Sequence, residues 1–386
     1  MLKKLIKEFK EKFGEGEVRS FFAPGRVNLI GEHIDYNGGN VFPCALSFGT
    51  YGIVRPRTDK KVRMFSSNFS DLGIIEFSLD ELVYDPKDNW TNYPKGVIKM
   101  FKDEGHKIET GFDMLVFGNI PNGAGLSSSA SVELLTSVTL KGLYNVDIDM
   151  VPMVKLSQKA ENEFVGVNCG IMDQFAIGMG KKDRAILLDC DTLEYTYAPV
   201  ELGDASIVIA NTNVKRGLAD SKYNERRGEC ERALLNLQTK LDIKSLGELT
   251  IAEFEENKHL ITNEIDRKRA KHAVYENQRT LKATQELEAG NIDAFGQLIN
   301  ESHISLRDDY EVSCKELDTL VEAAWEEKGT IGARMTGAGF GGCTVNIVKD
   351  EAIDDFIKNV GEKYQEKTGL KADFYIASIG DGAREL

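Results

Sequence analysis

The chain has 386 residues, of which 41% are hydrophobic and 28% are charged. These values exclude a disordered or fibrous protein, and the length exceeds what one hydrophobic core usually organises, so we expect two domains. Asp and Glu outnumber Lys and Arg by 62 to 48, and the net charge of −14 argues against binding of nucleic acid or anionic lipid through the general field. Any bound phosphate must therefore be held by local chemistry.

The cysteines and the N-terminal segment indicate where the protein resides. The six cysteines are scattered and form no CxxC pair, so they are typical of reduced thiols and not of a metal site or a compact disulfide framework. Residues 1–13 have apolar residues at helical spacing, but Lys and Glu interrupt them, so the uncharged core of a signal peptide is missing. No run approaches the roughly 18 apolar residues of a membrane span. We therefore expect a cytoplasmic protein without a membrane segment.

Hydrophobic patterns predict a mixed fold. In the first half, strands are predicted at 17–22, 49–56, 74–79 and 112–118, and helices at 94–104 and 126–144. In the second half, a strand at 206–211 and a long helical region at 216–327 precede strands at 333–337, 343–348 and 374–378 and a helix near 351–365. We predict an α/β N-terminal domain over 1–200 and an α+β C-terminal domain over 201–386.

The segment 121–131, PNGAGLSSSAS, joins a predicted strand to a predicted helix. Gly123 and Gly125 allow the backbone to approach a ligand closely, and the serines that follow occupy the cap and first turn of the helix, where free N–H groups favour an anion. No lysine follows the last glycine as in a Walker loop, so a metal and residues elsewhere must neutralise a bound triphosphate. A serine-capped glycine turn without a ligand is the alternative interpretation.

The segment 23–40, APGRVNLIGEHIDYNGGN, collects Arg26, Glu32, His33 and Asp35 among glycines and asparagines, outside any clear helical or strand period. Polar groups concentrated in a turn-rich segment usually line a site. Carboxylates and imidazole suit a sugar, because hydroxyls both donate and accept hydrogen bonds and a buried, fully paired network discriminates epimers. Considered alone, the segment also fits a solvated loop.

A third glycine-bearing segment, RMTGAGFGGCTVNI at 334–347, fits a hairpin turn when considered alone. In this order, however, the three segments resemble the signature set of the sugar and isoprenoid kinases grouped with galactokinase, homoserine kinase, mevalonate kinase and phosphomevalonate kinase. Within that group GRVNLIGEHIDYNGG resembles the galactokinase signature. Further galactokinase-like stretches are NWTNYPKGVI (89–98), QKAENEFVGVNCGIMDQF (158–175) and DSKYNERR (220–227).

The resemblance spans nearly the whole chain, and it implies both a fold and a reaction. The fold is the two-domain sugar-kinase fold of mixed sheets and helices, with the active site in the cleft between the halves. The reaction is transfer of a phosphoryl group from ATP, with Mg²⁺, to the C1 hydroxyl of galactose, which gives galactose 1-phosphate and ADP. The implied partners are these small molecules, with no nucleic acid or membrane, and the implied assembly is a monomer or weak homo-oligomer.

The resemblance also implies roles for residues at matching positions. Asp173 would be the catalytic carboxylate, with Arg26 beside it to stabilise that carboxylate and the charge on the transferring phosphoryl group. The sugar would be bound by Glu32, His33, Asp35, Gly170 and Tyr223. ATP would be bound by Ser67, Trp90, Gly123, Ala124, Gly125, Leu126, Ser127, Ser128 and Ser129, and Mg²⁺ by Ser129 and Glu161.

Ordinary structural roles are the alternative for each side chain considered alone. Asp173 would then be a helix cap, Glu161 a solvated helix residue, Trp90 a core anchor and Tyr223 half of a surface pair. The remaining histidines, His106, His259, His272 and His303, form no constellation with a functional meaning, so we interpret them as structural or surface groups and predict no zinc site.

Three other functions stay open on the sequence. Position 34 is Ile, where many galactokinases have Thr and N-acetylgalactosamine kinases have Ile, so the sugar is open to that alternative. Some galactokinase relatives are non-catalytic sugar sensors, but those lack the Ser-Ala pair that Ser129 and Ala130 provide here. A small alcohol such as mevalonate or homoserine as acceptor is disfavoured by the polar cluster at 32–35.

Overall fold

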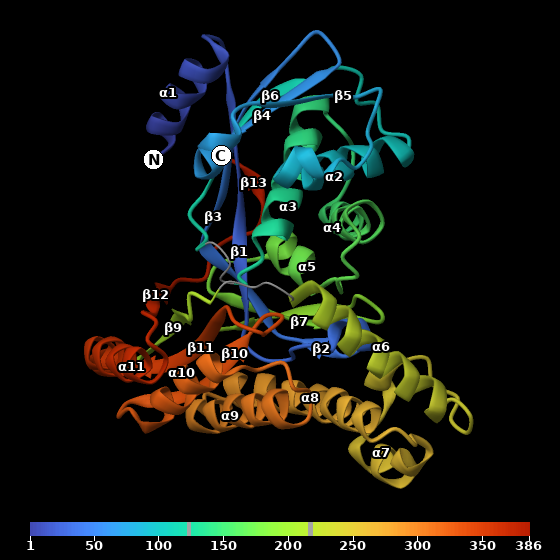
Figure 1. The fold of residues 1–386 in the computed structure, drawn as a ribbon, viewed down its shortest axis with the longest axis vertical. Coiled ribbons are helices and arrows are strands. Elements are labelled where there is room, and N and C mark those ends of the chain that lie inside the picture. Colours follow the sequence, from blue (N-terminus) through green and yellow to red (C-terminus); the bar gives the residue numbers. More distant parts are fainter. Residues whose placement is uncertain (122–124, 215–218) are drawn as a thin grey trace.

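The computed structural model describes residues 1–121, 125–214 and 219–386, so the predicted ATP-binding positions Gly123 and Ala124 lie outside the described residues. In Figure 1 the chain forms an upper part that contains both termini and a lower part rich in helices. The described strands form sheets of six, four and three strands. The predicted mixed α/β fold is confirmed. No helix within the described ranges is long and apolar enough to cross a membrane.

The upper part is built on the six-stranded sheet, with strand order β13-β1-β3-β6-β4-β5. Its strands are β1 (Arg19–Asn28), β3 (Pro43–Pro56), β4 (Lys61–Ser66), β5 (Ile75–Ser78), β6 (Phe112–Gly118) and β13 (Arg384–Glu385). Its helices are α1 (Leu2–Phe13), α2 (Asn92–Asp103), α3 (Ser128–Tyr144), α4 (Met150–Lys159) and α5 (Met172–Met179). All strand pairs are antiparallel except β4 with β6.

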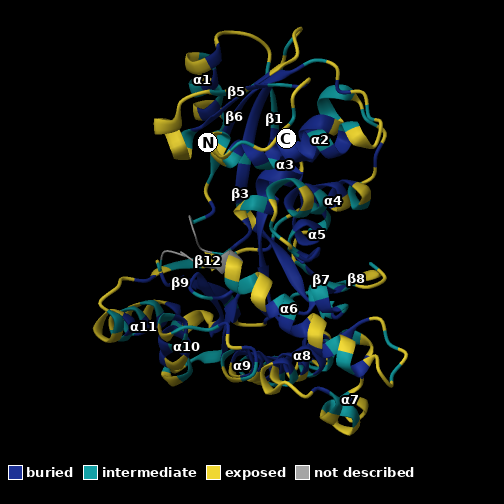
Figure 2. Cartoon of the chain, turned by 45° about the vertical axis from the view of Figure 1, so that its right-hand side comes forward, coloured by how far each residue is buried: buried dark blue, intermediate teal, exposed yellow. Residues whose placement is uncertain are grey.

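Helices cover both faces of this sheet, because successive strand residues point to opposite sides. Met64 and Met114 share a core cluster with residues of α2 and α3, whereas their neighbours Phe65 and Leu115 pack against α1. Figure 2 shows that α3 is buried along most of its length, as expected for a helix between the sheet and other helices.

The lower part contains a four-stranded sheet with strand order β10-β11-β9-β12. Its strands are β9 (Ala205–Asn211), β10 (Thr330–Thr336), β11 (Cys343–Lys349) and β12 (Asp373–Ala377). Its helices are α6 (Ala219–Leu237), α7 (Ile251–Asn257), α8 (Glu264–Glu288), α9 (Ile292–Asp308), α10 (Lys315–Glu326) and α11 (Ile353–Thr368). The third sheet consists of β2 (Asn40–Val41), β7 (Arg184–Asp189) and β8 (Tyr195–Pro199).

The two parts share a hydrophobic core. Val27 and Phe42, from the first 50 residues, belong to the same buried cluster as Ile207 of β9 and Phe295 of α9. Apolar contacts of this kind hold the two parts in a defined arrangement, and so they also fix the residues that lie between the parts. The predicted division at residue 200 stays a prediction, and the C-terminal strand β13 returns to pair with β1.

One sequence interpretation is wrong at the start of the segment 23–40. We expected it outside any strand, but its first six residues continue β1 as far as Asn28. All residues from Phe21 to Asn28 are buried. The sequence therefore lacks the alternation of apolar and polar residues that marks a strand with one solvent-exposed face.

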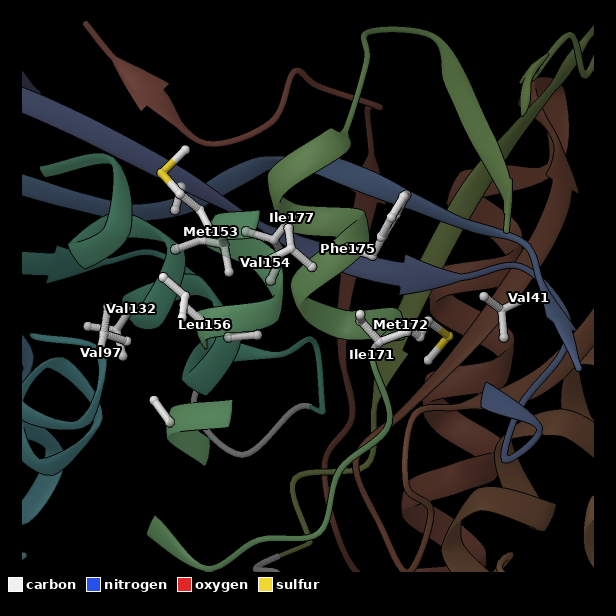
Figure 3. Close-up of a cluster of buried hydrophobic side chains, with 14 of the residues drawn as sticks. Val41, Val97, Val132, Met153, Val154, Leu156, Ile171, Met172, Phe175 and Ile177 are labelled. Carbon is white, nitrogen blue, oxygen red and sulfur yellow. The ribbon is translucent and has the colours of Figure 1, made fainter. Parts of the chain in front are cut away.

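Helix α5 is anchored by its apolar residues. Ile171 just before the helix and Met172, Phe175 and Ile177 within it are buried in the largest core cluster. Figure 3 shows Ile177 beside Met153 and Val154, which lie on α4. Because this core fixes the helix, Asp173 in its first turn is held in a defined position.

Candidate active site

A cavity of about 140 Å³ lies between segments that are distant in the sequence. It is lined by Arg26, Glu32, His33, Asp35, Glu161, Val167, Cys169, Gly170, Met172, Asp173, Tyr223, Gly337 and Ala338. The structure thus brings together every residue predicted for catalysis or sugar binding. Lining residues come from both the first 200 residues and the rest of the chain, as expected for a site between two halves.

Arg26 and Asp173 form a bidentate ion pair in this cavity. The Nε and Nη2 atoms of Arg26 each donate to an Asp173 carboxylate oxygen at 2.8 Å, and Nη1 donates to the Gly125 carbonyl at 2.7 Å. The hydroxyl of Ser127 also donates to Asp173. Burial opposes the charge of Arg26, but Asp173 and Glu32 raise its pKa above the ordinary value. A permanent cation therefore lies between the carboxylate and the glycine-serine segment.

A β-bulge positions this arginine. The register of β1 with β3 shifts between Pro24 and Arg26, which re-aims the side chain that follows. The backbone N–H of Arg26 then donates to the Leu126 carbonyl at 3.2 Å, so the strand is tied to the glycine-serine segment as well.

Asp35 fits against Gly170, which has no side chain. A Cβ atom at Gly170 would lie 1.9 Å from a carboxylate oxygen of Asp35, so only glycine leaves room for it. Burial, with the negative charges of Asp173 and Glu32, raises the pKa of Asp35 to about 7. Near neutral pH this carboxyl group is therefore available as either donor or acceptor for a hydroxyl.

Glu32 connects β1 to the glycine-rich segment 334–347. Its Oε1 atom accepts hydrogen bonds from the Thr336 hydroxyl at 3.0 Å and the Gly337 N–H at 2.8 Å, and it lies 2.7 Å from Nη2 of the buried Arg334. Gly337 has a φ of 82°, and a Cβ there would lie 2.8 Å from the Gly125 carbonyl oxygen. The three glycine-bearing segments that the sequence singled out therefore meet in space.

His33 is held by hydrogen bonds at both ring nitrogens. Nδ1 lies 2.8 Å from the Tyr36 hydroxyl, and Nε2 lies 3.2 Å from the Ala338 carbonyl oxygen. Burial and the proximity of His272 lower the pKa of His33 to about 3, so the ring is neutral. The Tyr223 ring, on α6, lies 5.4 Å from the His33 ring.

The two predicted metal ligands contact each other beside Asp173. Glu161 lies in a π-helical turn, Ala160–Val165, that continues α4, and its carboxylate accepts a hydrogen bond from Ser129. The Gln174 amide donates to Glu161 at 2.7 Å and to Glu133 at 3.0 Å. Burial and the charge of Asp173 raise the pKa of Glu161 to about 7.

A cation fits this group of carboxylates. Burial and the neighbouring Glu161 also raise the pKa of Glu133 well above its usual value, which is what an uncompensated cluster of acids produces. Oxygen donors and negative charge suit a hard divalent ion. No set of three or more His, Cys, Asp or Glu side chains in the described ranges is arranged as a metal cage, so a bound ion would take its remaining ligands from phosphate or water.

A second cavity, of about 210 Å³, lies next to the first turn of α3. It is lined by Thr50, Ser66, Asn68, Phe69, Trp90, Tyr93, Val116, Gly118, Ile120, Ser128, Ser129 and Val132. Trp90, Ser128 and Ser129, all predicted for ATP, are thus brought together. Ser129 also faces Glu161, which joins this cavity to the first one.

Three other predicted ATP-binding residues, Ser67, Gly125 and Leu126, are not among the described residues that line the second cavity. The Ser67 hydroxyl donates to Glu8 of α1 at 2.9 Å, while its neighbours Ser66 and Asn68 line the second cavity. The Leu126 side chain is buried in the core shared by the two halves, so only its backbone is available to a ligand. Gly125 has a φ of 73° and its carbonyl is used by Arg26.

Several site residues were not singled out by the sequence. Glu133 lies four residues after Ser129, on the same face of α3, and Gln174 follows Asp173, so spacing offered a signal for both. Tyr36 lies within the segment 23–40. Tyr310 offered no signal, because only the fold brings it to His33, at a ring distance of 5.0 Å.

Ile34 does not line the first cavity. Its side chain is fully buried in the largest core cluster, and Ile34 is absent from the described residues that line the cavity. The Thr-to-Ile difference that favoured N-acetylgalactosamine therefore involves no lining side chain. His272, which we interpreted as structural, is buried and contacts the Glu32 carbonyl at 3.1 Å.

Known proteins share this sequence and fold. Residues 7–56 match the galactokinase galactose-binding signature, residues 92–181 the GHMP kinases N terminal domain, and residues 283–366 the GHMP kinases C terminal domain. The galactokinase of Fusobacterium nucleatum is 67% identical over 388 residues and covers 100% of both chains. That of Bacillus subtilis is 60% identical, over 98% of this chain and 97% of its own.

A solved structure is similar to this chain in both fold and sequence. Lactococcus lactis galactokinase complexed with galactose superposes with a TM-score of 0.98 at 53% identity, over 100% of both chains. The resemblance inferred from the sequence motifs is thereby confirmed. The chain belongs to the galactokinase family, one branch of the GHMP kinases.

Proposed function

We propose that the protein transfers the γ-phosphoryl group of ATP to the C1 hydroxyl of galactose, giving galactose 1-phosphate and ADP. The observation that carries this proposal is the Arg26–Asp173 ion pair, which lies where the polar cavity adjoins the glycine-serine segment. The galactokinase names of the relatives and the galactose bound to the Lactococcus lactis protein support the choice of sugar.

In this mechanism Asp173 faces the acceptor hydroxyl. Its Oδ2 atom accepts from both Arg26 and Ser127, whereas Oδ1 accepts from Arg26 alone among the hydrogen bonds of the described structure, so Oδ1 has room for the sugar hydroxyl. The carboxylate would orient that hydroxyl and receive its proton as the phosphoryl group moves. Arg26 would balance the negative charge on the transferring group.

The polar residues of the cavity would bind the other sugar hydroxyls. Glu32, His33 and Asp35 offer acceptors and donors, and Tyr223 of α6 lines the same cavity with its ring 5.4 Å from that of His33. Since Glu32 and His33 are buried, a sugar with a misplaced hydroxyl would leave polar groups of the cavity poorly paired, which discriminates strongly between epimers.

We propose Ser129 and Glu161 as the residues that hold Mg²⁺, with Glu133 behind them. The ion would supply charge neutralisation for the phosphates of ATP. Trp90 would stack on adenine in the second cavity, with Ser128 and Ser129 at the phosphate end. These assignments extend the site from the sugar to the nucleotide.

The reaction and the sugar are tested together by product analysis. We expect ADP release with galactose to exceed that with glucose, N-acetylgalactosamine or mevalonate, and phosphorus NMR to show phosphate on C1. Faster turnover of N-acetylgalactosamine or a phosphate on C6 would overturn the substrate assignment. Galactose binding without any ADP release would indicate a non-catalytic sensor.

The metal assignment is tested with a matched pair of variants. Glu161→Gln should raise the Mg²⁺ concentration needed for half-maximal rate and reduce turnover strongly. Glu163→Gln is the control, because Glu163 is exposed in the same helical turn. Full activity of Glu161→Gln at limiting Mg²⁺ would remove it from the ligand set.

We also propose a cytoplasmic location, which the scattered cysteines without a CxxC pair support. The absence of nucleic-acid partners and the monomeric or weakly oligomeric state stay predictions.

A further inference from the structure

Behind His33 lies a chain of polar contacts that none of the proposed roles uses. The Tyr36 hydroxyl lies 2.8 Å from His33 Nδ1 and 2.7 Å from the Tyr310 hydroxyl, which in turn lies 3.2 Å from Cys230 Sγ. These residues come from the turn after β1, from the end of α9 and from α6. Three distant segments therefore converge on one nitrogen of His33.

The direction of the hydrogen bonds in this chain follows from its far end. His33 Nε2 lies 3.2 Å from the Ala338 carbonyl oxygen, which can only accept. In a neutral imidazole one nitrogen donates and the other accepts, so Nε2 carries the proton and Nδ1 accepts from Tyr36. Tyr36 has then used its only hydrogen, so Tyr310 donates to Tyr36, and Cys230 donates to Tyr310.

The far end of the chain, at Tyr310 and Cys230, is buried and anchored, whereas Tyr36 is half-buried. Tyr310 is 0% exposed and Cys230 is 1% exposed, which leaves little access for water as a competing donor. Arg226 Nε donates to the Tyr310 carbonyl at 2.8 Å and thereby holds its backbone. The Asn37 amide donates to the His33 carbonyl at 2.8 Å, which stabilises the uncommon φ of 61° at His33.

We propose that Tyr36 and Tyr310 are positioning residues that, together with the Ala338 carbonyl, hold His33 as the Nε2–H tautomer, so that His33 offers the sugar a donor and no acceptor. This inference rests on the proposed sugar-binding function of the cavity. The Nε2···O distance of 3.2 Å is at the long end of the N–H···O range, so a sugar oxygen can share or replace the Ala338 carbonyl. The sugar group that meets His33 must then be able to accept a hydrogen bond.

The tautomer is tested first in the free protein, without any reliance on activity. Long-range ¹H–¹⁵N NMR distinguishes Nε2–H from Nδ1–H, and the His33 signals are identified by their absence in His33→Gln. We expect Nε2–H alone in the unchanged protein, and a smaller excess of Nε2–H over Nδ1–H in Tyr36→Phe, where only the Ala338 carbonyl still favours Nε2–H. An Nδ1–H or doubly protonated His33 in the unchanged protein would overturn the proposal.

Kinetics then test the consequence for the sugar. We expect Tyr36→Phe to raise the KM for galactose about tenfold with kcat changed less than about twofold, as for loss of one oriented hydrogen bond. Tyr310→Phe should act in the same direction with a smaller effect. Tyr275→Phe is the control, because its hydroxyl meets Glu255 at 3.1 Å on an exposed surface.

A set of monodeoxygalactoses separates positioning from general damage. For the sugar that lacks the hydroxyl facing His33, the effect of Tyr36→Phe on KM should fall toward one, because the partner is already absent. An equal effect on every deoxy sugar would contradict the proposal. A wrong proposed function gives a different result. The unchanged protein would then show no galactose turnover, whereas NMR of the free protein would still show the Nε2–H tautomer.

Discussion

The cavity proposed for the sugar and the cavity proposed for the nucleotide, called the sugar cavity and the nucleotide cavity below, are adjacent but are built in opposite ways. The sugar cavity gathers charged groups from the first half of the chain beside Tyr223, Gly337 and Ala338 from the second half, and several of these charged groups already have partners, such as Arg26 with Asp173 and Glu32 with the Gly337 N–H. The nucleotide cavity is formed by residues 50–132 only, and its walls include Phe69, Trp90 and Ile120. The first is organised by hydrogen bonds, and the second offers apolar surface.

This difference indicates how each ligand is selected. A buried, pre-paired network rejects a ligand that leaves any member unsatisfied, so it suits a small polar substrate with close epimers. An apolar slot with one aromatic ring binds a planar base through contact area, with less dependence on single atoms. Substitutions in the two cavities should therefore differ in kind as well as in size.

The largest effect is expected where the sugar cavity meets the phosphoryl group. Asp173→Asn keeps the shape but removes the proton acceptor, so turnover should fall about 10²-fold or more while galactose binding largely survives. Arg26→Lys keeps a charge but loses the fork that holds both carboxylate oxygens at 2.8 Å, so it should also lower turnover steeply. Steady-state kcat and galactose affinity by calorimetry are the measurements.

The double variant shows whether this pair acts as one unit. If Asp173 and Arg26 depend on each other, the double variant should be little worse than the poorer single variant. Additive losses in log rate would indicate independent roles. Near-normal turnover of Asp173→Asn would remove that residue from the catalytic set.

A smaller effect, confined to the sugar, is expected from Gly170→Ala. The added Cβ would lie 1.9 Å from the Asp35 carboxylate, so this side chain must move away from its position in the cavity. We expect the KM for galactose to rise tenfold or more, and the KM for ATP to stay within about twofold. Gly228→Ala is the control, because a Cβ at Gly228 would lie 3.7 Å from a guanidinium nitrogen of Arg232, which is an ordinary contact distance. A matching rise in the KM for ATP would contradict the separation of the two cavities.

The sequence predicted the mixed fold and singled out residues that line one cavity, but it left several elements of the fold unpredicted. Motifs such as 23–40 and 121–131 name residues whose chemistry is local, so they could be found without coordinates. Strand β4 and helix α5 were not predicted, because short buried elements lack a clear period. Tyr310 could not be predicted either, since only packing of α9 against the first half brings it near His33.

In the nucleotide cavity, removal of the Trp90 ring should weaken ATP binding only moderately. Trp90→Ala should raise the KM for ATP about tenfold, since aromatic stacking on a base contributes roughly 1–3 kcal/mol. Trp90→Phe should recover part of this loss. The galactose KM at saturating ATP should not change. If Trp90→Ala leaves the KM for ATP unchanged, adenine does not stack on this ring.

The smallest effect is a pH dependence of stability that only the sugar cavity should show. Burial, Asp173 and Glu32 raise the pKa of Asp35 to about 7 in the folded protein, from an ordinary value of 3.8. Between these values the folded state keeps a proton that the unfolded chain has lost, so this group's contribution to stability is full below about pH 4 and is lost as pH rises through 7. Asp35→Asn removes the titration, so its free energy of unfolding relative to the unchanged protein should increase between pH 5 and 7.5, by up to about 1.4 kcal/mol per pH unit below the folded-state pKa. Ser128→Ala, in the nucleotide cavity, should give a pH-independent difference, because no ionisable group is changed.

Urea unfolding at pH 5, 6, 7 and 8 measures all three proteins, and Glu161 titrates in each of them, so its contribution cancels. Parallel pH profiles for Asp35→Asn and the unchanged protein would mean that Asp35 ionises in its ordinary range, and that the charges of the sugar cavity are better solvated than their burial implies.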